Sequence, residues 1–282
     1  MRRSWVLYVI SVIILVLMVA NIVLASDTQI IPESAHISME DVVDAKLSAL
    51  SIECSAERNE LLNEAENLTD TINSEEIVVY DVEDGVSRKQ ETTDTYVTDF
   101  SNMYKVFTLS IEDVVKGYYE VDKQFSDLIT DNYLWEAPIR DQNGNVVSSA
   151  SFRKGVSFEA FEKKSKDMIF ENQETKDAVC DFVRSKEGKW YWVRTGNLIP
   201  NEEVEFVSDH SALTKYINNL GFPRVEDIKY VSLGIYRTDI LYIRAEGKEY
   251  GITFTLRPDL AGLENRKLYE IGEIIDILSN MY

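Results

Sequence analysis

One uncharged apolar segment, Trp5–Ala25, constrains this chain more than any other part of its sequence. It runs for 21 residues without a charged side chain, after Arg2 and Arg3 and before the first acidic residue, Asp27. As a helix rising 1.5 Å per residue it would be about 32 Å long, close to the roughly 30 Å hydrocarbon core of a bilayer. The basic residues before it predict that the N-terminus faces the cytoplasm and that the remainder lies outside. We therefore expect an extracytoplasmic protein.

This segment has two interpretations: a transmembrane helix that remains as an anchor, or a signal peptide that is removed. Val23–Ala25 fits the small-x-small pattern of a cleavage site after Ala25. Against cleavage, residues 20–25 contain no Pro or Gly and continue the apolar helix. The sequence leaves a single-pass anchored form and a secreted form open. Residues 26–37 are expected to form a spacer in either form.

The charge balance of the exported part excludes one class of function. Beyond residue 25 the chain carries 27 basic and 49 acidic side chains. A surface this acidic repels nucleic acids and anionic lipid headgroups, so we expect no nucleic-acid partner. Acidity of this kind usually keeps an exported protein soluble, and it also attracts cationic partners. The lipid bilayer is expected as a partner only through Trp5–Ala25.

The two cysteines, Cys54 and Cys180, both lie in the exported part. An extracytoplasmic location permits a Cys54–Cys180 disulfide, although two cysteines are too few to staple a scaffold. Whether their Cα atoms approach closely enough is a spatial question. The alternative is that Cys54 packs as a small hydrophobe on an apolar helix face.

A long amphipathic helix is expected within residues 38–75. Apolar residues recur there every eleven positions, in two rows: Val43, Cys54 and Ala65, and Leu50, Leu61 and Ile72. An eleven-residue period favours a straight or weakly right-handed helical contact. An apolar stripe of this kind is expected to pack against either the rest of the chain or a second copy of it. Self-association through helix 39–73 is therefore one expected mode of partnership.

Residues 76–200 are expected to form an α+β domain, with a polar loop or linker at residues 81–94. Its clearest element is a hairpin of Leu134–Arg140 and Val146–Phe152, because Asn143-Gly144 suits a tight turn. The turn resembles a calcium loop only superficially, since Val146 replaces the required Gly and Phe152 the bidentate Glu. Residues 157–187 look mainly helical, and Trp190–Val193 reads as a strand.

Residues 201–282 are expected to form a C-terminal domain with the order β-α-β-β-β-α. A strand at Val204–Val207 precedes a helix that Asp209 caps, and Gly221 ends that helix. Three strands and a closing helix follow. The fold class predicted for the whole chain is α+β, with antiparallel sheets that carry helices on one side.

The sequence holds no recognisable catalytic or cofactor motif. Its two histidines, His36 and His210, stand apart from each other and from the cysteines, so zinc spacings and a supported Ser-His-Asp triad are absent. Phosphate-binding glycine loops are absent as well. We assign no catalytic residue, metal site or cofactor. Because carboxylates are abundant, a carboxylate-dependent hydrolase of cell-envelope glycans remains an alternative.

Three tryptophans, Trp135, Trp190 and Trp192, are the candidate ligand-binding residues. Trp190 and Trp192 share one face of their strand. Exposed, the rings would form a stacking platform; buried, they would belong to the core, where large aromatics usually pack. The leading hypothesis is a non-catalytic ectodomain that binds a protein or cell-envelope ligand. A cleft with two carboxyls, one of them with a raised pKa, would favour the hydrolase instead.

Overall fold

The computed structural model describes residues 38–280, apart from 75–78, 84–85, 91–95, 122, 169, 197–198 and 235–237. The expected membrane or signal segment, its cleavage site after Ala25 and the spacer lie outside the described residues. Among the described residues, no helix has the length and apolar character needed to cross a membrane. Residues Met39–Tyr282 form one compact unit.

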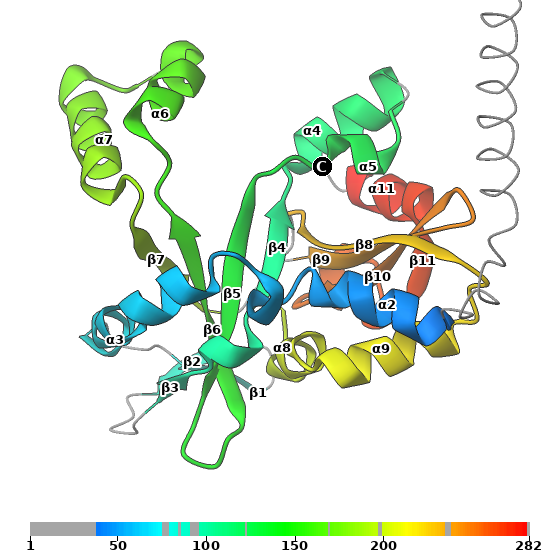
Figure 1. Cartoon of the computed structure of the whole chain (residues 1–282). Helices are drawn as coiled ribbons and strands as arrows, with labels where there is room; N and C mark the ends of the chain where they lie inside the picture. The colour runs from blue at the N-terminus through cyan, green and yellow to red at the C-terminus, as the bar shows by residue number, and fades with distance from the viewer. Residues whose placement is uncertain are drawn as a thin grey trace, which may run out of the picture. The chain divides into compact units, whose positions relative to one another are not determined.

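A mixed nine-stranded sheet organises this unit (Figure 1). Eight strands follow one another across the sheet, and β3 (Val97–Thr98) pairs separately with β5. The order from one edge to the other is β11 (Leu268–Glu270), β10 (Lys248–Thr255), β9 (Thr238–Ala245), β8 (Val225–Ser232), β4 (Tyr104–Thr108), β5 (Tyr133–Arg140), β6 (Val146–Lys154) and β7 (Trp190–Thr195).

The α+β class is confirmed, but the sheet is not purely antiparallel. β4 and β8 run parallel, with Phe107 opposite Val231 and Thr108 opposite Ser232. This pair joins the two regions that the sequence suggested as separate domains, 76–200 and 201–282, so one sheet runs through the expected boundary. A pairing between residues more than 100 positions apart leaves no local pattern in the sequence, which is why it was not predicted.

Helices cover both faces of β8–β10, whereas the sequence suggested one (Figure 1). On one face, a core cluster contains residues of α2 (Met39–Ser48), α8 (Asn201–Ser208) and α9 (His210–Asn219). On the other, a second cluster contains residues of α4 (Ile111–Val115), α5 (Phe125–Leu128), α10 (Pro258–Ala261) and α11 (Ile271–Ser279). The reason lies in β9, whose residues 240–243 are all apolar and fully buried. Uninterrupted apolar runs are typical of strands buried on both faces.

The expected helix at residues 38–75 is broken into three pieces. α2 ends at Ser48, a 3-10 turn, η1, spans Ile52–Cys54, and α3 spans Arg58–Ser74. The Ser51 and Ser55 hydroxyls accept hydrogen bonds from the backbone N–H groups of Glu53 and Glu57, a local alternative to helix continuation. The apolar stripe is therefore shared between two cores of this chain.

The expected position of Cys54 is wrong, and no disulfide joins the two cysteines. Cys54 lies in η1 and is exposed rather than packed on a helix face. Cys180 lies in α7 (Gln173–Lys186) and is half-buried, and both thiols are free. The break at Ser51 accounts for the exposure of Cys54, because it takes residues 52–54 out of the helical repeat.

Two further segments differ from the sequence interpretation. The tract expected as a linker at 81–94 contains parts of a separate two-stranded hairpin, β1 (Val79–Glu83) and β2 (Val86–Gln90). Val204–Val207 lies in α8 and not in a strand, because Pro200 starts a helix that has Glu202 and Glu203 in its first turn. The run fits either structure, because Val204 and Phe206 alternate as in a strand while Val204 and Val207 are three apart as on a helix face.

The local predictions made from turn and cap residues are confirmed. β5 and β6 form the expected hairpin, in which the Asp141 carboxylate accepts the backbone N–H groups of Asn143 and Asn145 at 2.8 Å. Asp209 caps α9 as expected. The remaining helical elements are η2 (Phe100–Asn102), a π-helical turn η3 (Lys116–Glu120), α6 (Phe158–Lys164), η4 (Ser165–Asp167) and α7.

Candidate functional site

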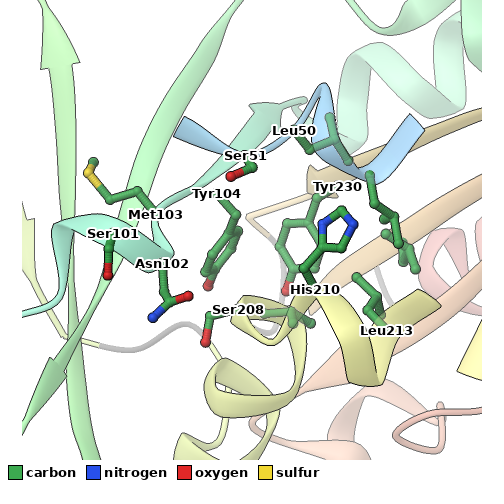
Figure 2. A pocket seen from close by; sticks show the side chains of 13 residues that line it. Leu50, Ser51, Ser101, Asn102, Met103, Tyr104, Ser208, His210, Leu213 and Tyr230 are labelled. Carbon is green, nitrogen blue, oxygen red and sulfur yellow. The ribbon is translucent and has the colours of Figure 1, made fainter. Parts of the chain in front are cut away.

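A small pocket opens where α2 and η1, η2, and the corner between α8 and α9 meet over the sheet (Figure 2). Its cavity volume is about 60 Å³. Both polar and apolar side chains line it. The lining residues are Leu47, Leu50, Ser51, Ser101, Asn102, Met103, Tyr104, Val207, Ser208, His210, Leu213, Tyr230 and Leu241.

Two tyrosines from the parallel pair β4 and β8 form the floor of the pocket. The rings of Tyr104 and Tyr230 meet edge to face, with centroids 5.3 Å apart. Figure 2 shows both hydroxyls pointing toward the side where Ser208 lies. Burial raises the pKa of each phenol well above its usual value, helped by nearby carboxylates, so both stay neutral.

The two floor hydroxyls differ in their partners. Tyr230 donates to an Asp239 carboxylate oxygen at 3.3 Å. Tyr104 is only 7% exposed, and within the described part of the chain its hydroxyl forms no hydrogen bond. The Tyr104 hydroxyl is not sealed from solvent as Asp239 Oδ1 is, so it is available to a group that enters the pocket.

The rim of the pocket is polar and links separate helices. His210 Nε2 lies 2.7 Å from Asp44 Oδ1, joining the start of α9 to α2. The Asn102 side chain donates to Asp99 at 2.8 Å, which fixes the η2 side of the opening. The sequence placed His210 correctly in a first turn but gave no signal for its position at a pocket, because Asp44 is 166 residues away.

The two floor tyrosines belong to a row of polar side chains that crosses six strands of the sheet. Its members are Asp239 on β9, Tyr230 on β8, Tyr104 on β4, Glu136 on β5, Ser151 on β6 and Arg194 on β7. The register places Tyr104 opposite Glu136, Glu136 opposite Ser151, and Ser151 opposite Arg194. We call this set the transverse polar row.

Hydrogen bonds hold the Glu136 end of the row. Glu136 accepts from Ser149 at 3.0 Å, from Ser151 at 2.8 Å, and from Arg194 Nη2 at 2.9 Å. Arg194 Nε also lies 3.0 Å from Ser151 Oγ. A buried carboxylate is tolerated in a sheet only when it is paired and hydrogen-bonded, and Glu136 meets both conditions.

Asp239, at the other end of the row, is less well compensated. Burial, with a smaller contribution from the nearby Glu136 carboxylate, raises its pKa to about 7 against the opposing effects of Ser232, Arg194 and Tyr230. Its Oδ1 atom is buried without a hydrogen-bond partner among the described residues. Glu136 and Asp239 are thus two carboxyls close enough to interact, one of them with a strongly raised pKa.

This carboxyl pair does not form the cleft that a hydrolase requires. Glu136 is 5% and Asp239 4% exposed, and neither lines the pocket, whereas their neighbours in the row, Tyr104 and Tyr230, do. A catalytic carboxyl has to come within hydrogen-bond reach of the group it protonates. The pair therefore has a raised pKa without access to a substrate.

A wider groove of about 1040 Å³ lies between α4, α5 and the ends of β4 and β8. Its charged lining residues include Glu112, Asp113 and Asp127, all exposed. It is large enough for a sugar, but its carboxylates stand in solvent and not in the apolar surroundings that a catalytic acid needs. Lys116 and Lys123 also line it, so its charges are mixed.

The three candidate tryptophans pack in a third core, between β5–β7 and α3. Trp135 and Trp190 are buried and Trp192 packs half-buried against them. Trp135 Nε1 donates to Glu57 at 2.7 Å, and Trp192 Nε1 donates to Thr195 at 3.0 Å. The sheet brings the three indoles together on one face, where α3 covers them, so they do not offer an open platform.

Among the described residues, no three His, Cys, Asp or Glu side chains are grouped as metal ligands. The chain matches no known protein family, no curated protein and no solved structure closely enough to establish a relationship.

Proposed function

We propose that this chain is a non-catalytic extracytoplasmic module that binds a protein or cell-envelope ligand, held at the membrane or secreted. The pocket over Tyr104 and Tyr230 is its recognition site. The observation that carries the proposal is the cavity volume of about 60 Å³. Pockets that enclose small-molecule ligands usually measure roughly 300–1,000 Å³, so this one takes a single short group of a larger ligand.

The chemistry of the pocket suggests which group enters. Leucine, valine and methionine supply six of its thirteen lining residues, and Tyr104 contributes a hydroxyl that has no partner among the described residues. A short aliphatic group bearing one hydroxyl or carbonyl would remove apolar surface from water and satisfy Tyr104. The ligand's remaining surface would contact the polar rim formed by Ser51, Ser101 and His210.

A glycan hydrolase is the weaker candidate, supported only by the raised pKa of Asp239. It would need a movement of Tyr104 and Tyr230 large enough to open the Glu136–Asp239 pair to a sugar. The edge-to-face contact of the two rings and their burial work against such an opening.

Filling the pocket tests the binding function. Ser208→Leu places a side chain into the cavity, and we expect it to weaken co-sedimentation of the full-length chain with envelope material about tenfold or more. Ser211→Leu makes the same change one turn away at an exposed position of α9 and is expected to leave binding unchanged. Equal binding by all three proteins would contradict the assignment of this pocket.

The same envelope material distinguishes the two functions. A binding module releases no new reducing ends from it. Release that disappears in Asp239→Asn, with the fold retained, would instead establish the hydrolase.

The extracytoplasmic location has its own test, which uses the exposed Cys54 thiol as a reporter. A maleimide reagent that does not cross membranes should label the chain in intact cells, and Cys54→Ser should remove most of the label. Labelling that requires cell lysis would place the described residues in the cytoplasm and overturn this part of the proposal.

A further inference from the structure

The outer edge of β7 is the long free edge of the sheet within the described part of the chain. β7 has six residues, whereas β11 at the opposite edge has three and leads directly into α11. Two described backbone hydrogen bonds lie at the ends of β7, and both face β6. Gly155 N–H donates to Lys189 O, and Gly196 N–H donates to Ser149 O. An unpaired strand edge is a template for another strand.

The sequence of β7 favours such pairing. It reads Trp-Tyr-Trp-Val-Arg-Thr, in which aromatic and β-branched residues prevail and neither Pro nor Lys occurs. Val193 sits at the point where the β6–β7 register shifts, and it is 40% exposed. The bulge and the inward-pointing Arg194 protect the C-terminal half of the strand, and they leave Trp190–Trp192 in regular pairing with β6.

An exposed aromatic and basic cluster lies next to this edge. Tyr191 is opposite Arg153 of β6, and its ring meets the ring of Phe182 of α7, which is 50% exposed. Lys186 Nζ lies 5.8 Å from the centroids of both rings. Figure 1 shows α6 and α7 beyond the ends of β6 and β7, away from the other helices of the unit.

The charge here is opposite to that of the whole chain. Residues 184–195 contain four basic side chains and one acidic side chain, on a protein with a net charge of −20. Arg153 donates to the Asn132 side chain, Lys189 donates to the Ser185 carbonyl, and Lys186 lies over the two rings. Among the described residues, none of these three cations pairs with a carboxylate.

We infer that the edge of β7 binds an extended, acidic segment of a partner protein, which adds to the sheet as a further strand. Backbone hydrogen bonds would supply pairing, carboxylates would meet Arg153, Lys186 and Lys189, and apolar side chains would meet Phe182 and Val193. A second copy of this chain fits less well, because β7 against β7 would bring two sets of unpaired cations together. This surface is separate from the pocket over Tyr104.

The probe is a blocked six-residue peptide of alternating glutamate and valine, added to the full-length chain. Hydrogen exchange is expected to show protection of residues 190–195, and a lysine–valine peptide is expected to give none. Two further acidic peptides carry N-methyl groups, one along each edge of the extended backbone. If the peptide adds as a strand, one of these two should lose affinity about tenfold or more while the other binds.

Charge-reversal variants complete the test. Lys186→Glu should weaken the acidic peptide about tenfold, whereas Lys176→Glu, the same change at an exposed position of α7, should not. Equal affinity for acidic and basic peptides, or binding that neither N-methyl pattern weakens, would overturn the inference. A dimer of the free chain with residues 190–195 already protected would show that a second copy occupies the edge.

Discussion

Between about pH 4 and pH 7 the free energy of unfolding is expected to fall as the pH rises, and Asp239→Asn should remove this fall. Burial raises the pKa of Asp239 from 3.8 to about 7. In this window the unfolded chain loses the proton of Asp239 while the folded chain keeps it. The contribution is therefore fully present below the unfolded pKa and lost as the pH rises through the folded pKa. At 1.36 kcal/mol per unit, the change is roughly 4 kcal/mol.

Urea unfolding of the full-length chain, measured at pH 4.5 and pH 7.5, checks this prediction. The useful quantity is the stability difference between Asp239→Asn and the natural sequence, because both share the general charge repulsion of an acidic chain. That difference should move in favour of the variant by several kcal/mol as the pH rises. A difference that is the same at both pH values would show that Asp239 is ionised throughout.

Two other carboxyls, those of Asp99 and Asp141, affect the free energy of unfolding at lower pH than Asp239 does. Hydrogen bonds from neighbouring side chains, together with Arg140, outweigh burial and lower the pKa of Asp99, while bonds from Asn145 and Asn143 lower that of Asp141. Their contributions are present above the unfolded pKa and are lost as the pH falls through the folded values. They therefore weaken the fold below pH 4 and do not disturb the window in which Asp239 acts.

Arg194→Met is expected to destabilise the fold by about 2–4 kcal/mol, the second large effect. It removes the cation that lies 2.9 Å from Glu136 and leaves a carboxylate that is 7% exposed with only the two serine donors. Breaking a buried pair on one side usually costs about 3–5 kcal/mol, and we lower the range because Arg194 itself is 36% exposed.

The matched control for this prediction is a double variant. Glu136→Gln with Arg194→Met removes both charges and retains an amide that the serine hydroxyls can bond. It should recover most of the stability that Arg194→Met loses, as measured by urea midpoints. If the double variant is as unstable as the two single losses added together, the uncompensated charge is not the cause, and lost packing of the Arg194 stem is.

Local chemistry explains which parts of the fold were predictable from the sequence. Asp209 and the Asn143-Gly144 turn act on backbone groups a few residues away, so the cap and hairpin predictions are confirmed. The only sequence signal for the break after α2 is the pair of serines Ser51 and Ser55. Their hydroxyls accept backbone N–H groups that a continuous helix would use, and this effect outweighs the apolar repeat. Residues 240–243 did carry the signal of a strand covered on both faces.

The site was less predictable than the fold. Tyr104 and Tyr230 meet because β4 pairs with β8, although 125 residues lie between the two tyrosines in the sequence. No spacing in the sequence predicts that contact. The three tryptophans were candidates because they are large aromatic residues, but their packing against α3 makes them part of the core. Glu136 and Asp239 were two among 49 acidic residues, and only the sheet order selects them.

The transverse polar row also has a consequence for how the chain reaches one arrangement. Successive side chains of a strand point to opposite faces, so a slip of one residue would turn Glu136 into the layer occupied by Trp135 and Phe152. There the carboxylate would meet aromatic rings and α3 in place of Arg194 and its serines, at a cost of several kcal/mol. The transverse polar row therefore helps to select the correct strand register. It raises the free energy of mispaired strands during folding more than it lowers the free energy of the correct sheet.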